Sequence, residues 1–219
     1  MKPKNIQTAT KLSPLSLGAI AALSLNSQAA VFANGGFDNY TGGGNNIDIN
    51  TLTPSTWVGT GAAQHKTAAP GLTAQAGGFY FGLFLNGDGT TGSGISQGFD
   101  TAIGQAYEIT YYLAKQNTSP NPTLSIDVFD GSGFLGANLG TDTITIDWAQ
   151  DTWVQQTMLF TADSTTTTLR FLEIGNSVGS DPFIDTVVLT AVSVPEPSSL
   201  ALLGSALVFG LAHRRRNHR

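Results

Sequence analysis

The chain of 219 residues has no cysteine, which excludes a disulfide framework and any thiolate site. It also has few charges. Only 11% of its residues are charged, so the fold depends more on buried apolar surface than on surface ion pairs. Glycine is plentiful, at 26 residues, but follows no three-residue period, which excludes a collagen-like chain. The length allows one domain of ordinary size.

Basic side chains are scarce in the middle of the chain. Between Ala30 and Ser193 there are three, Lys66, Lys115 and Arg170, against 14 acidic ones, so the formal charge of this span is −11. Nucleic acid is therefore not expected as a partner. A surface of this kind fits a soluble extracellular protein, including one that binds a divalent cation.

Groups that could carry out catalysis are also few. His65 is the only histidine between the two ends, and its Gly/Ala-rich surroundings predict a solvated loop residue. Glycosidases need two carboxylates across a cleft. The two glutamates of the central span, Glu108 and Glu173, occupy polar positions of strand-like patterns and are expected to point outward. We therefore expect that the protein is not an enzyme.

The amino terminus is typical of a signal peptide. Three lysines precede an apolar stretch at residues 15–25, which is long enough for the core of a signal peptide and too short to span a bilayer. Small residues at the positions that a signal peptidase reads predict a cut after Ala29, with Ala33 as the alternative. Residues 1–29 are then removed; the other interpretation is an amphipathic helix of the mature protein.

The carboxyl terminus carries a second apolar stretch, residues 200–212. Pro195, Glu196 and Pro197 precede it, and a basic cluster closes the chain. This order resembles the PEP-CTERM sorting signal, over residues 194–219. The resemblance implies a Gram-negative bacterium that makes extracellular polysaccharide, and an exosortase that recognises the tail and cleaves near the Pro-Glu-Pro motif.

The basic cluster also fixes a topology. By the positive-inside rule it stays in the cytoplasm, which leaves everything before it outside. We expect an exported protein, extracellular or on the cell surface, that is held transiently in the inner membrane by a short hydrophobic helix. An ordinary tail anchor is the alternative interpretation.

The span 30–193 is predicted to be β throughout. Apolar and polar residues alternate in short runs separated by Gly-, Pro-, Asn- and Asp-rich turns, and no window has a sustained helical period. The expected strands cover residues 79–85, 94–99, 107–113, 124–128, 144–148, 153–161, 168–174 and 183–190. About eight strands at this spacing indicate an all-β sandwich.

The order of short motifs is also informative. Asn34-Gly35-Gly36-Phe37-Asp38 opens the span, Trp57 and Gly94-Ile95-Ser96-Gln97 follow, and Pro182-Phe183-Ile184-Asp185-Thr186-Val187 closes it. This order is similar to that of the galactose-binding-like jelly rolls found in carbohydrate-binding modules and in exported bacterial and plant wall proteins. The resemblance covers residues 31–192 and implies a single jelly-roll β-sandwich that binds sugars on an aromatic platform.

Five aromatic residues are candidates for such a platform: Trp57, Tyr80, Tyr111, Tyr112 and Trp148. We expect Trp57, Tyr80 and Tyr111 to bind carbohydrate, although core packing is the competing role for each ring. Adjacent Tyr111 and Tyr112 must point to opposite faces of a strand, so one of them belongs to the core.

The jelly-roll resemblance also implies one structural calcium ion. In such domains the first and last strands run side by side, and a calcium site often ties them together. Asp38 and Asp185 lie in the two corresponding motifs and are the expected ligands. The alternative is that both are solvated turn or edge residues.

Three classes of function remain open. The first is an exported, non-catalytic protein of the extracellular matrix or cell surface that binds polysaccharide. The second is a structural matrix protein that associates with itself through edge strands. The third, which the scarcity of catalytic groups disfavours, is a glycan hydrolase.

Overall fold

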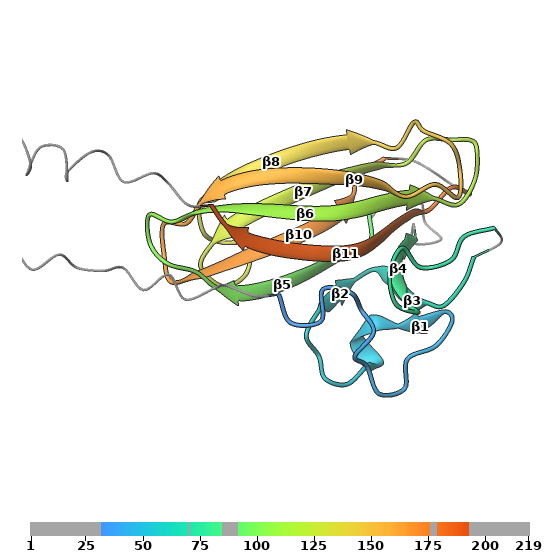
Figure 1. Ribbon diagram of the computed structural model, residues 1–219, viewed down its shortest axis with the longest axis horizontal. Helices are drawn as coiled ribbons and strands as arrows, with labels where there is room; N and C mark the ends of the chain where they lie inside the picture. The colour runs from blue at the N-terminus through green and yellow to red at the C-terminus, as the bar shows by residue number, and fades with distance from the viewer. Residues whose placement is uncertain (1–31, 70, 85–91, 176–178, 193–219) are drawn as a thin grey trace, which may run out of the picture.

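The computed structural model describes residues 32–69, 71–84, 92–175 and 179–192 (Figure 1). The predicted signal-peptide cut after Ala29, the Pro-Glu-Pro motif and the hydrophobic tail lie outside these residues. In the described part of the chain, no helix has the length and apolar character needed to cross a membrane.

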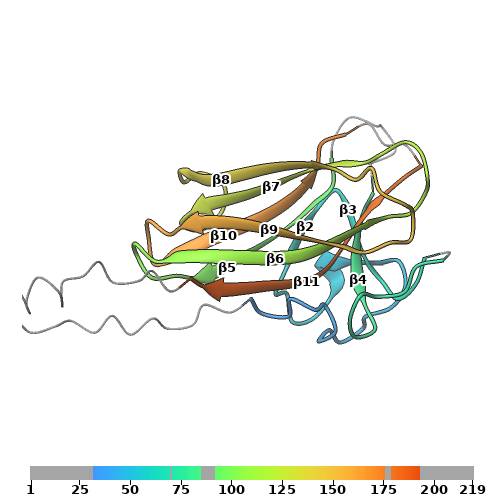
Figure 2. The same cartoon turned by 45° about the horizontal axis from the view of Figure 1, so that its top comes forward.

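Two antiparallel sheets form the fold. In order across the six-stranded sheet, the strands are β1 (Ile47–Asp48), β3 (Ala62–Lys66), β4 (Tyr80–Phe84), β11 (Pro182–Ala191), β6 (Ala106–Lys115) and β9 (Val154–Thr161). In order across the five-stranded sheet, they are β2 (Val58–Thr60), β5 (Gly94–Asp100), β10 (Thr166–Glu173), β7 (Thr123–Asp130) and β8 (Asn138–Thr145). A single 3₁₀ turn, η1 (Ile49–Thr51), follows β1 among the described residues. Figures 1 and 2 show the sheets as two packed layers, which confirms the predicted all-β jelly-roll sandwich.

The main core lies between the two sheets. On β6 every second residue points inward, so Tyr107, Ile109, Tyr111 and Leu113 are fully buried while their neighbours face outward. This is the period of two that places alternate side chains on opposite faces of a strand. On β6 the alternation in the sequence therefore determines which side of the strand faces the core.

A second, smaller apolar cluster lies on the outer side of the six-stranded sheet. Its buried members are Leu72, Tyr80, Ala114 and Phe183, and Trp153 packs at its border. Tyr80 contacts both Phe183 and Trp153 edge-on, with ring centroids 5.2 and 5.6 Å apart. The Trp153 indole donates a hydrogen bond to the Thr73 carbonyl at 2.8 Å, which ties the segment before β4 to this face.

The opening motif runs beside the last strand, as the jelly-roll resemblance implies. The Val187 backbone N–H donates to the Gly35 carbonyl at 2.9 Å. A Cβ on Gly35 would lie only 2.0 Å from the Val187 carbonyl oxygen, so the contact requires glycine.

Most of the expected strands are found within one to three residues of their predicted bounds. The exception is the run predicted at 144–148, because the actual strand, β8, ends at Thr145. Just beyond β8, the Ile146 N–H donates to the Pro122 carbonyl at 2.9 Å, next to the last pair of the β7–β8 ladder. The short strands β1, β2 and β3 were not predicted, since their segments are rich in glycine and alanine.

Candidate functional site

The three aromatic residues proposed as a sugar platform are buried. Trp57, Tyr80 and Tyr111 are each no more than 1% exposed, so, contrary to the prediction, none of the three presents a ring face on which a sugar could stack. The Trp57 ring packs against Phe32 and Phe37 and donates its indole N–H to the Asn34 carbonyl at 3.2 Å. Tyr111 belongs to the main core, and Tyr80 is covered by the segment before β4.

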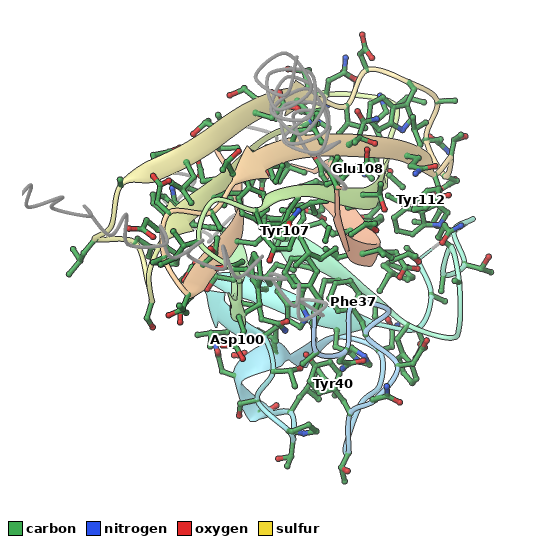
Figure 3. The ribbon with its side chains drawn as sticks, turned by 60° about the vertical axis from the view of Figure 1, so that its left-hand side comes forward. Phe37, Tyr40, Asp100, Tyr107, Glu108 and Tyr112 are labelled. Carbon is green, nitrogen blue, oxygen red and sulfur yellow. The ribbon has the colours of Figure 1, made fainter. Side chains whose placement is uncertain are left out.

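Tyr112 is the outward-facing member of the tyrosine pair, as the alternation requires. It is half-buried, and its hydroxyl donates to the Gln155 side-chain oxygen at 3.3 Å. In Figure 3 Glu108 and Tyr112 lie on the outer side of β6, and Tyr107 lies on the inner side. Trp148 is half-buried too, but its indole N–H is bound to the Thr152 carbonyl in a loop.

The outer face of the five-stranded sheet carries a row of side chains that crosses all five strands. The cross-strand register places, in order, Val58, Ser96, Arg170, Asp127 and Thr141 next to one another. We call this surface, together with Phe134 above it, the Arg170 face. Its members are hydroxyl, charged or exposed apolar groups.

An ion pair lies at the centre of this row. The Arg170 Nη2 and Nε atoms donate to the Asp127 Oδ2 atom at 2.8 and 3.2 Å. Ser125 and Thr141 also donate to the Asp127 carboxylate, which is almost fully buried. Two of the five guanidinium N–H groups are thus bound to Asp127 in the described structure, and the Arg170 side chain stays 26% exposed.

Two phenylalanine rings hold the guanidinium in place. The Arg170 Cζ atom lies 4.9 Å from the ring centroids of both Phe129 and Phe134. Phe129 is buried in the sheet, whereas Phe134 is 40% exposed and belongs to the loop after β7. Thr168 fixes this loop, since its hydroxyl donates to the Gly131 carbonyl and accepts from the Gly133 N–H. Phe134 was not predicted as a site residue, because no strand pattern marks its loop.

Beside Arg170, β5 places the small residues Gly94, Ser96 and Gly98 on its outer side, and its last residue, Asp100, is exposed on the same side. Next to Arg170, therefore, no large side chain of β5 stands on the Arg170 face. The segment 94–98 also has the Gly-x-Ser-x-Gly spacing of a hydrolase nucleophile elbow. That elbow requires a sharp turn from a strand into a helix, and Ser96 lies instead in the middle of a regular strand.

Two other expectations for titratable residues are wrong. His65 is fully buried in β3, where it stacks on Phe79 with ring centroids 4.3 Å apart, and its ring nitrogens are hydrogen-bonded to backbone groups of Phe37 and Gly44. It is therefore a core residue. Glu108 does face outward, half-buried, but Glu173 is 1% exposed.

Asp38 and Asp185 bind the same short segment, residues 75–78. Asp185 accepts hydrogen bonds from the Gln75 and Ala76 N–H groups, at 2.7 and 3.4 Å, and Asp38 accepts from the Gly78 N–H at 2.7 Å. The two motifs that were expected to share a calcium ion do meet here. Among the described residues, no group of three or more acidic, histidine or cysteine side chains is placed to hold a metal. The calcium ion stays a prediction.

Residues 32–190 match the sequence model of a family described as "Protein of unknown function (DUF642)". The chain belongs to this family. Residues 193–216 match the PEP-CTERM protein-sorting motif, which confirms the interpretation of the tail and marks the DUF642 chain as an exported protein sorted by an exosortase. No curated protein matches the chain.

Several solved structures share the fold. The carbohydrate-binding module TmCBM61, in complex with beta-1,4-galactotriose, is 16% identical with a TM-score of 0.52, over 74% of this chain and 99% of that one. A Stig cyclase from Fischerella sp. TAU is 17% identical with a TM-score of 0.54, over 76% and 99%. The arabinose-bound MgGH51 arabinofuranosidase is 13% identical with a TM-score of 0.56, over 77% of this chain and 27% of that one. At these identities the likeness shows the jelly-roll fold alone.

Proposed function

We propose that the mature protein is a non-catalytic component of the extracellular matrix or cell surface that binds polysaccharide on the Arg170 face. One observation carries the proposal: the exposed ring of Phe134 lies 4.9 Å from a guanidinium that has N–H groups to offer. A sugar presents both an apolar C–H face and hydroxyl groups, so an aromatic ring next to a fixed hydrogen-bond donor suits it.

The surroundings of Arg170 support a chain-like ligand. A polysaccharide lying over β5 would meet the Ser96 hydroxyl, the guanidinium N–H groups that are not bound to Asp127 and the apolar side chain of Val58, which is 55% exposed. The rigid pairing of Arg170 with Asp127 means that little side-chain entropy is lost when a ligand binds. Some of the proteins that share the fold are carbohydrate-binding modules, which agrees with this proposal.

The same geometry argues against hydrolysis at this face. Hydrolysis of a glycosidic bond uses two carboxylates with separate roles. Asp127 is nearly buried, paired with Arg170 and bound by two hydroxyl groups, so it has no capacity to act as a base or nucleophile. Cyclases and hydrolases also occur among the proteins of similar fold, so turnover is a fair outcome to measure.

The experiment is affinity electrophoresis of the secreted protein in gels that contain a neutral polysaccharide. We expect retardation by at least one of galactan, xylan and β-glucan, and an affinity about tenfold lower for Phe134→Ala. Ile103→Ala is the matched control, since Ile103 is an exposed apolar residue of a different turn. Retardation that is absent with every polymer, or unchanged in Phe134→Ala, would overturn the proposal. Assembly without ligand would favour self-association instead.

A further inference from the structure

The outer face of the six-stranded sheet carries a second set of residues suited to a ligand. The cross-strand register places three rows side by side on β11, β6 and β9: Thr190, Glu108 and Leu159; Val188, Thr110 and Thr157; Asp185, Tyr112 and Gln155. Asp185 is buried, and the other eight residues are half-buried or exposed. We call these eight residues the Tyr112 face.

Tyr112 is the aromatic residue of this face. Its hydroxyl is hydrogen-bonded to Gln155, and in the register of the sheet Tyr112 lies between Gln155 on β9 and buried Asp185 on β11. After Tyr112 along β6, the next outward residue is Ala114, and Trp153 and the segment before β4 cover the sheet there. The open part of the face therefore begins at the tyrosine ring.

Along β6 the open part continues with polar and apolar groups in alternation. Thr110, Thr157 and Glu108 supply hydroxyl and carboxylate groups, and Leu159 and Val188 are 65% and 45% exposed. This combination of hydrogen-bonding groups, an aromatic ring and apolar rims suits the two kinds of surface that a sugar presents.

The negative charge of the domain favours a neutral polysaccharide over an acidic one. Within the described residues, the Tyr112 face includes the carboxylate of Glu108 and no basic side chain. A polymer of uronic acids would be repelled by this carboxylate and by the formal charge of −11 on the central span. A neutral polysaccharide would not.

We propose that the Tyr112 face is a second binding site, for a neutral polysaccharide, on the side of the sandwich opposite the Arg170 face. This proposal rests on the proposed function in one respect, since both faces are proposed to bind glycans. The two faces consist of different residues and lie on different sheets. Two sites on opposite faces make one domain able to bridge two polysaccharide strands. Such bridging raises avidity without any new contact.

The test compares four forms of the secreted protein: wild type, Tyr112→Ala, Phe134→Ala and the double variant. The probes are the same neutral polysaccharides, in affinity gels and in solution by light scattering. We expect each single variant to bind about tenfold more weakly and the double variant to be unretarded. Wild type should increase the scattering of the dissolved polymer, while either single variant should not. Tyr112→Phe keeps the ring and should behave as wild type.

The outcomes separate the two proposals. If Tyr112→Ala equals wild type in both measurements while Phe134→Ala loses binding, the second site is overturned and the proposed function stands. If Tyr112→Ala alone abolishes binding, sugar binds only on the Tyr112 face and the Arg170 face is overturned. If wild type binds none of the polymers, both fail. Unfolding midpoints of all forms must agree, since a collapsed variant would lose both sites together.

Discussion

The ring of Tyr111 on β6 packs edge-on against Phe171 on the opposite sheet, with 5.1 Å between ring centroids. The contact places the Tyr111 hydroxyl in the interior, where it has no hydrogen-bond partner among the described residues. A buried hydroxyl without a partner is destabilising, and its desolvation also raises the pKa of Tyr111.

Replacing this tyrosine by phenylalanine should therefore stabilise the fold. We expect Tyr111→Phe to raise the free energy of unfolding by about 1 kcal/mol, measured by urea denaturation. Tyr112→Phe is the matched control; it removes a surface hydrogen bond and should change stability by less than about 0.5 kcal/mol. A clear loss of stability in Tyr111→Phe would show that the hydroxyl has a partner.

Removing Arg170 should destabilise the protein, apart from any effect on binding. Arg170→Ala leaves Asp127, whose side chain is 5% exposed, without its cation, and we expect a loss of about 2–4 kcal/mol in urea denaturation. Replacing Asp127 as well should recover part of this loss, because no unpaired buried charge is then left. Equal stability of Arg170→Ala and wild type would contradict the role assigned to the pair.

Two carboxyl groups, buried Asp185 and half-buried Asp181, make the free energy of unfolding decrease as the pH rises. Burial raises the pKa of Asp185 to about 6 and that of Asp181 to about 6, from 3.8, with Lys66 opposing the rise at Asp181. Because the folded-state pKa is the higher one, the folded protein binds more protons than the unfolded chain between about pH 4 and pH 6. Each group therefore contributes stability that is lost as the pH rises through about 6.

The measurement is a comparison with Asp181→Asn. The free energy of unfolding of the wild type, relative to this variant, should fall from pH 4 to pH 7. The comparison cancels the titration of all other groups. A relative stability that rises over the same range would mean that the folded-state pKa of Asp181 is lowered.

The predicted calcium ion can be tested by thermal unfolding. Asp38 and Asp185 both accept hydrogen bonds from residues 75–78, so an ion shared by the two carboxylates would lie beside this segment. If the ion is present, calcium should raise the melting temperature relative to chelator, and Asp185→Asn should abolish that rise. Asp163→Asn, an exposed aspartate, is the control. Identical curves with calcium and chelator would exclude the site.

The sorting tail predicts the mass of the exported protein. If an exosortase cleaves near Pro195, Glu196 and Pro197, the form recovered outside the cell should lack the residues after about position 197. Intact mass spectrometry of the secreted protein measures this directly, and the same spectrum shows whether the amino terminus is Ala30. A retained basic cluster would instead indicate a plain membrane anchor.

The fold was predictable because its long strands carry their own pattern. β7 alternates apolar and polar residues from Leu124 to Val128, and β6, β9 and β11 are rich in aromatic and β-branched residues, which specifies the strands. β3 was missed because it contains Ala62, Ala63 and His65, which have no β-branched or aromatic signal apart from the histidine. Its pairing with β4 comes from tertiary contacts.

The candidate site was less predictable, for a geometric reason. Alternation distinguishes the two faces of a strand, but it does not reveal whether a loop covers the outer one. Tyr80 points outward and is still buried, because the segment before β4 folds over it. Arg170 and Asp127 are far apart in sequence, and only the register between β10 and β7 brings them together.

The end of β11 determines where the sorting tail leaves the domain. Val192 is hydrogen-bonded to Ala106 and Gln105, at the end of the sandwich where β6 begins, and the sorting motif starts at the next residue. The tail is therefore joined to one end of the sandwich and not to the outer surface of either sheet. Removal of the tail would leave the residues of the Arg170 face and the Tyr112 face unchanged.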